Sequence, residues 1–124
     1  MHTVSFIGGG NMAAAIIGGL IASGTQPTDI EVVEINADAR AQMAARLGVV
    51  THSDLSQARL SGMIVLAVKP QILPEVSAVL ASRLTGQLVV SIAAGVRVAD
   101  LSRWMGGHQL IVRAMPNTPA LVQA

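Results

Sequence analysis

Short apolar runs alternate along this chain with longer segments in which apolar and polar positions repeat at helical spacing. The runs predict strands at Thr3–Ile7, Ile30–Ile35, Val49–Val50, Met63–Val68, Leu88–Ile92 and Gln109–Arg113. The intervening segments predict helices at Asn11–Ser23, Asp38–Leu47, Gln71–Arg83 and Val98–Trp104, and a brief one capped by Ser53 or Asp54 that ends near Arg59. Strands alternating with helices form parallel sheets, so we expect an α/β, doubly wound domain with helices on both faces.

Glycine and proline agree with these helix boundaries. Gly24 and Gly48 follow the first two long helices, and Gly106–Gly107 follows the last one, where C-terminal caps are common. Pro74 falls in the first turn of its helix, where the missing N–H costs little. The four long helices are therefore expected to start and stop near the positions given.

The first strand runs directly into Gly8-x-Gly10-x-x-Ala13 and then into an apolar helix. A dinucleotide site needs this order: Gly8 for a tight turn, Gly10 for close approach of the backbone to a pyrophosphate, and a small Ala13 for packing. The start of the helix adds N–H groups and the positive end of its dipole. A plain turn with small residues would explain Gly8 and Ala13 but not three consecutive glycines. A Rossmann-like dinucleotide site is the favoured interpretation.

Composition narrows the alternatives. The 124 residues form one domain; 52% are hydrophobic and 12% charged, which fits a sheet covered on both faces and some surface covered by another domain or subunit. The net charge is +1, with one Phe, one Trp and no basic run, so nucleic acid is not an expected partner. There is no cysteine, and the three histidines lack ligand spacing, so we expect no metal site. No segment matches a signal peptide or membrane span, which predicts a cytoplasmic protein.

Distinctive turns follow the ends of four predicted strands. They are Glu34 and Asn36; Ala67, Val68, Lys69 and Pro70; Ser91 to Gly95; and Met115 to Pro119. Ligands of such folds bind outside the carboxyl ends of the strands, so these turns and the glycine loop are expected to share one edge. Ser91, Asn117 and Thr118 offer hydrogen bonds of suitable reach for a nicotinamide or ribose. Lys69 is either a cofactor contact or a solvated lysine at a helix start.

Four motifs in order resemble those of Δ1-pyrroline-5-carboxylate reductases. They are Phe6–Met12 (FIGGGNM), Leu66–Pro70 (LAVKP), Val90–Gly95 (VSIAAG) and Ile111–Pro119 (IVRAMPNTP). The resemblance runs through essentially the whole chain, and its second and fourth motifs are the most selective.

The resemblance implies reduction of the C=N bond of 1-pyrroline-5-carboxylate to proline by hydride from NADPH or NADH. It implies a pyrophosphate site at Gly8, Gly9, Gly10, Asn11 and Met12, a ribose contact at Asn36, and a nicotinamide site lined by Ala67, Val68, Lys69, Pro70, Ile92, Ala93 and Ala94. Asn117 is a further candidate for cofactor binding. In that family a C-terminal helical domain holds the substrate and forms the dimer, so we assign no catalytic residue to residues 1–124 and expect a homo-oligomer only through that domain.

One departure bears on the cofactor. Glu34 occupies the position after the second strand where NAD enzymes place a carboxylate on the ribose hydroxyls, whereas the family more often has a small, amide or hydroxyl side chain there. We therefore expect NADH to be at least tolerated. Two other interpretations stay open: another oxidoreductase of this architecture, of the β-hydroxyacid dehydrogenase or F420-dependent NADP reductase type, and a non-catalytic nucleotide-binding module.

Overall fold

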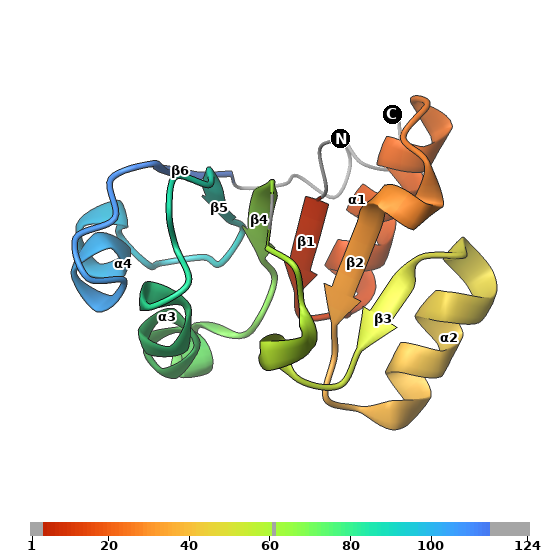
Figure 1. Cartoon of the computed structure of the whole chain (residues 1–124), viewed down its shortest axis with the longest axis horizontal. Helices are drawn as coiled ribbons and strands as arrows, with labels where there is room; N and C mark the ends of the chain where they lie inside the picture. The colour runs from red at the N-terminus through yellow and green to blue at the C-terminus, as the bar shows by residue number, and fades with distance from the viewer. Residues whose placement is uncertain (1–3, 61, 115–124) are drawn as a thin grey trace.

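The computed structural model describes residues 4–60 and 62–114. Within these ranges six parallel strands form one sheet in the order β3–β2–β1–β4–β5–β6 (Figure 1). The strands are β1 (Val4–Ile7), β2 (Ile30–Val33), β3 (Val50–His52), β4 (Met63–Leu66), β5 (Val89–Ser91) and β6 (Ile111–Arg113). The helices are α1 (Asn11–Ala22), α2 (Ala37–Leu47), α3 (Leu73–Ala81) and α4 (Val98–Trp104), with 3-10 turns at Pro27–Asp29, Leu55–Gln57 and Pro70–Ile72. The predicted doubly wound α/β fold is confirmed.

Two apolar layers hold the sheet between its helices. On one face Phe6 and Val32 pack with Ile17 of α1 and Met43 of α2. On the other, side chains of β4 and β5 pack with Leu73 and Leu80 of α3 and Leu101 of α4; Figure 1 shows α3 and α4 on the side of the molecule away from α2. Strands buried on both faces explain why the sequence shows continuous apolar runs rather than strict alternation.

Several elements end earlier than the sequence predicts. The second strand stops at Val33, and Ile35 beyond it is 82% exposed. The predicted helix Gln71–Arg83 divides into the Pro70–Ile72 turn and α3, because two prolines lie close together and each removes a backbone donor. The brief helix after residue 53 is a single 3-10 turn, capped by Asp54. Gly48 caps α2 with φ +71°, as expected, whereas α1 is capped by Ser23, with Gly24 one residue further.

Glu31 on β2 carries a buried carboxylate, and the residue is 3% exposed. Its oxygens accept hydrogen bonds from Ser5 Oγ on β1 and from the backbone N–H groups of Arg59 and Leu60, and His52 Nε2 lies 3.0 Å from Oε1. Leu60 has φ +54°, which is unusual for a branched residue. Glu31 therefore ties β1, β3 and the segment entering β4 together.

Candidate functional site

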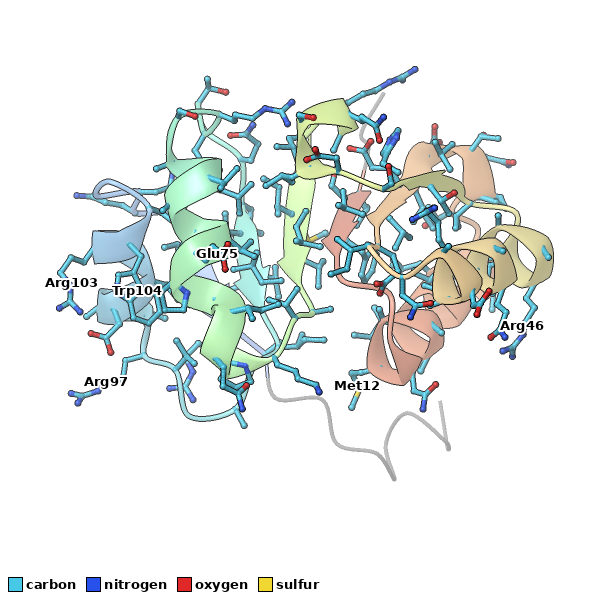
Figure 2. The ribbon with its side chains drawn as sticks, turned by 90° about the horizontal axis from the view of Figure 1, so that it is seen from below. Met12, Arg46, Glu75, Arg97, Arg103 and Trp104 are labelled. Carbon is cyan, nitrogen blue, oxygen red and sulfur yellow. The ribbon has the colours of Figure 1, made fainter. Side chains whose placement is uncertain are left out.

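The carboxyl edge of the sheet gathers the segments that the sequence singles out. Because the strands are parallel, the loops after β1, β2, β4 and β5 all leave this edge. Backbone hydrogen bonds link them: Gly8 N–H donates to Val33 O at 2.8 Å, Ala67 N–H to Ile7 O at 2.8 Å and Ile92 N–H to Leu66 O at 3.2 Å. Figure 2 views the molecule from below, and Met12 projects from the start of α1 there. The expected shared edge is confirmed for these four loops.

Packing within the protein accounts for the first two glycines of the loop. Gly8 has φ +102°, and a Cβ on it would lie 2.7 Å from the carbonyl oxygen of Ala67, so a side chain would push the β1 and β4 loops apart. A Cβ on Gly9 would lie 3.2 Å from Glu34 Oε1 and 3.3 Å from Val32 Cγ1. Gly8 is therefore required by the fold itself, whereas a side chain on Gly9 would need Glu34 and Val32 to give way by a few tenths of an ångström.

Gly10 is different, because packing gives no reason for a glycine. Its φ of −80° and ψ of −170° suit any residue, it is exposed, and no atom of the described residues beyond its two chain neighbours lies within 4 Å of a Cβ built on it. Gly10 is the N-cap of α1 and offers no side-chain acceptor, and the first turn holds no acidic residue. Helix geometry leaves the first N–H groups pointing outward, so this open position suits an anionic group that must approach the backbone.

The loop after β2 is built around a carboxylate. Glu34 Oε1 accepts the N–H of Gly9 at 2.9 Å, and Oε2 accepts the N–H of Asn36 at 2.9 Å. Asn36 caps α2 by accepting the N–H of Ala39, and Arg40 Nη1 donates to the main-chain oxygen of Glu34 at 2.8 Å. The acidic position was predicted, but its bond to the glycine loop was not. Ile35, which the sequence analysis made the last residue of the second strand, instead lies exposed in this loop.

The loop after β4 carries Ala67, Val68, Lys69 and Pro70 along the same edge. Ala67 and Val68 are partly buried and contact the Gly8 turn, whereas Lys69 and Pro70 are exposed. Within the described ranges no carboxylate oxygen lies within 4.0 Å of the Lys69 ammonium. Lys69 is therefore an exposed cation at this edge with no ion-pair partner among the described residues.

The loop after β5 corrects one expectation. Ser91 is fully buried, and its Oγ accepts the N–H of Ala93 at 3.3 Å, so the hydrogen bond that it was expected to offer a nicotinamide or ribose is not accessible in this structure. Val89 and Ser91, which share one face of β5, are both buried, whereas Val90 between them is only partly buried, a difference that the sequence motif does not reveal. Ile92 is partly buried, Ala93 is 6% exposed and Ala94 is exposed. Asn117 and Thr118 lie outside the described residues.

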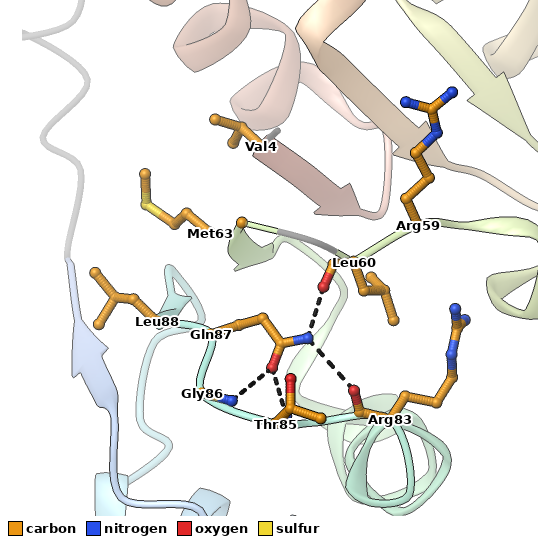
Figure 3. Close-up of a pocket in the computed structure, with 10 residues that line it drawn as sticks. Val4, Arg59, Leu60, Met63, Arg83, Thr85, Gly86, Gln87 and Leu88 are labelled. Atoms are coloured by element: carbon orange, nitrogen blue, oxygen red, sulfur yellow. Dashed lines mark hydrogen bonds between the residues drawn. The ribbon is translucent and has the colours of Figure 1, made fainter. Parts of the chain in front are cut away.

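Cavities lie at both edges of the sheet in the described part of the chain. One of about 440 Å³ adjoins the glycine loop between α1 and α2, lined by Gly10, Ala14, Gln42 and Arg46 among others. The other, about 770 Å³, lies at the amino ends of β1, β4 and β5, away from the glycine loop (Figure 3). There the amide of Gln87 is already bonded to Leu60 O and to the N–H groups of the preceding turn. The larger cavity was not predicted, and its polar side chains mainly join loops.

Within the described ranges the structure holds no group of three or more His, Asp or Glu side chains that could hold an ion. No helix in the same ranges combines the length and apolar character that a membrane crossing requires.

The sequence of this chain matches a known protein family. Residues 3–95 match the model of the family described as NADP oxidoreductase, coenzyme F420-dependent. The chain belongs to this family. Within it the chain is similar to pyrroline-5-carboxylate reductases: it is 43% identical to that of Pseudomonas aeruginosa over 122 residues, which cover 97% of this chain and 45% of that protein. The resemblance read from the motifs is confirmed.

Solved structures give the same result for this member of the family. A pyrroline-5-carboxylate reductase of Coxiella burnetii superposes with a TM-score of 0.91 at 41% identity, covering 99% of this chain and 47% of that one. The pyrroline carboxylate reductase of Plasmodium falciparum, solved with NADP bound, has a TM-score of 0.82 at 27% identity, covering 98% and 44%. The chain therefore spans somewhat less than half the length of these relatives.

Proposed function

We propose that this chain binds NADH or NADPH at the carboxyl edge of its sheet and supplies the cofactor-binding part of an enzyme that reduces 1-pyrroline-5-carboxylate to proline. The observation that carries the binding site is Gly10. It is a glycine without a packing or dihedral reason, at the uncapped start of a 12-residue helix. A pyrophosphate lying against the backbone would supply that reason.

Each loop then has a part in holding the dinucleotide. The N–H groups at Asn11 and Met12 bind the pyrophosphate, and Glu34 and Asn36 face the adenine ribose. Ala67 to Pro70 and Ile92 to Ala94 line the nicotinamide half, with Asn117 as a further contact. The bound cofactor supplies a hydride to the imine carbon. The role of this chain is to fix that ring and leave one face open to the substrate.

The choice of reaction rests on the similarity to named relatives. The family description mentions coenzyme F420, but its match ends at residue 95, whereas similarity to pyrroline-5-carboxylate reductases covers 97% of the chain. This favours the imine reductase over an F420-dependent or β-hydroxyacid enzyme. In this proposal the protein is cytoplasmic. A C-terminal helical domain holds the substrate carboxylate and forms the homo-oligomer.

Replacing Gly10 with Val tests the binding site. The backbone of Gly10 suits valine and the space around it is open, so we expect the fold and its stability to be retained. The branched side chain would occupy the approach to the helix start, and dinucleotide affinity should fall at least tenfold, about 1.4 kcal/mol. Calorimetric titration with NADH and NADPH measures this.

Gly86→Val is the matched control. Gly86 is also exposed with open space around it, but it lies next to the cavity at the opposite edge. This variant should bind both dinucleotides as the unchanged protein does. Unchanged affinity in Gly10→Val, with an intact circular dichroism spectrum, would remove the glycine loop from the site.

A further inference from the structure

Glu34 joins two loops that a dinucleotide must contact together. One carboxylate oxygen accepts the N–H of Gly9 in the glycine loop, and the other accepts the N–H of Asn36 at the start of α2, both at 2.9 Å. These bonds fix the carboxylate at the end of β2, where it is partly buried. The glycine loop is shaped around it, since a Cβ on Gly9 would approach Glu34 Oε1 to 3.2 Å.

The negative charge of Glu34 is not neutralised by a neighbouring cation. Arg40 is the nearest basic residue in the sequence, but its guanidinium donates to the main-chain oxygen of Glu34. In the described part of the chain no Lys, Arg or His nitrogen lies within 4.0 Å of the Glu34 carboxylate. An anion placed beside this carboxylate would therefore meet uncompensated repulsion at short range.

The fixed position of the Glu34 carboxylate and its unneutralised charge would both act on the adenosine ribose of a bound dinucleotide. A dinucleotide with its pyrophosphate at Gly10 places its adenosine ribose beside the end of β2. A free 2′-hydroxyl there can donate to the fixed carboxylate, whereas a 2′-phosphate would bring a second negative charge against it. Relief would require the carboxylate to leave the N–H groups of Gly9 and Asn36. Arg40 would also have to leave its carbonyl partner.

We propose that Glu34 selects dinucleotides with a free adenosine 2′-hydroxyl, so that this chain prefers NADH to NADPH. The N–H groups of Gly9 and Asn36 hold its carboxylate in the position that makes this selection. The inference rests on the proposed dinucleotide site. It runs against the family description and the NADP-bound relative, so experiment can decide between them.

The test is the ratio of NADPH to NADH dissociation constants, measured by calorimetry on the 124-residue protein. The unchanged protein should bind NADH at least tenfold more tightly than NADPH. Glu34→Ser, which removes the charge and opens space, should lower this ratio at least tenfold, mainly by tighter NADPH binding. Glu34→Gln keeps the size and one acceptor oxygen but no charge, so it should also lower the ratio.

Glu75→Gln is the matched control, because Glu75 is an exposed carboxylate in the first turn of α3. The ratio of NADPH to NADH dissociation constants in this variant should equal that in the unchanged protein. NMR of the Gly9 and Asn36 amides gives a second readout: both should shift in Glu34→Ser and stay unchanged in Glu75→Gln.

Three results would overturn the proposal. One is a preference of the unchanged protein for NADPH. Another is an equal loss of both affinities in Glu34→Ser with the ratio unchanged, which would make the carboxylate a purely structural support. The third is binding of neither dinucleotide by the folded, unchanged protein, which would refute the dinucleotide site itself, whereas the first two leave that site standing.

Discussion

The 124-residue chain by itself is expected to show no measurable reduction of 1-pyrroline-5-carboxylate with NADH or NADPH. Hydride transfer needs the imine carbon held about 3–3.5 Å from the nicotinamide, and a donor where charge develops on the nitrogen. Among the described residues of the carboxyl edge, Ser91 is buried and Lys69 is exposed. These residues therefore offer no enclosed donor for the imine nitrogen of a substrate.

A chimeric protein provides the positive control for the inactivity expected of the 124-residue chain. Joining this chain to the remaining part of the 43% identical Pseudomonas aeruginosa relative should restore oxidation of NADH or NADPH that depends on 1-pyrroline-5-carboxylate. The same chimera carrying Gly10→Val should lose most of that turnover at low cofactor concentration. Enzyme-like turnover by the 124-residue chain alone would show that we have misplaced the substrate site. A folded chimera that binds the cofactor but does not reduce the substrate would count against the proposed reaction.

Glu31→Ala is expected to be the most destabilising single change that we consider. It would leave Ser5 Oγ and the N–H groups of Arg59 and Leu60 without their acceptor inside the protein. An unsatisfied buried group costs about 1–3 kcal/mol, so the free energy of unfolding should fall by roughly 3 kcal/mol or more. Urea denaturation followed by the fluorescence of Trp104, the only tryptophan, measures this. A loss no greater than that in Glu75→Ala would contradict the role given to the network.

The same network gives the stability an acid dependence. Burial raises the pKa of Glu31, but the hydrogen bonds from Ser5, Leu60, Arg59 and His52 outweigh it and hold the pKa below its ordinary value of 4.5. A lowered folded pKa contributes stability that is complete above the unfolded pKa and is lost as the pH falls through the folded pKa. Glu31→Gln lacks this contribution. The difference in unfolding free energy between it and the unchanged protein should therefore narrow as the pH drops below 4.5, and a constant difference would contradict the assignment.

The sequence predicted the order of strands and helices and the parallel sheet, and for Val98–Trp104 it predicted both ends of the helix. It could do so because the spacing of apolar residues and the positions of glycine and proline are local signals. What it could not predict depends on partners far along the chain. The bond from Gly9 to Glu34 joins residues 25 positions apart, and the burial of Ser91 depends on what covers the sheet face to which its side chain points. The motif also treated three glycines alike, whereas the structure separates Gly8, which the fold requires, and Gly9, which is tightly packed, from Gly10, which is neither.

Glu31 was the clearest signal left unused by sequence reasoning. A charged residue within the apolar run Ile30–Val33 needs a partner when the strand is central in a sheet. That partner could not be named from the pattern, because the N–H groups it binds lie 28 and 29 residues away.

Lys69 has a practical consequence for anyone handling this protein. It is the only lysine of the chain, and its ammonium lies exposed on the edge assigned to the dinucleotide. Amine-directed chemistry on a side chain will therefore attach every dye, bead or sensor surface at that edge. A protein immobilised in this way presents its far side to solution and covers its own binding site. Attachment through an engineered cysteine at the opposite edge would keep the site open, since the chain has no cysteine of its own.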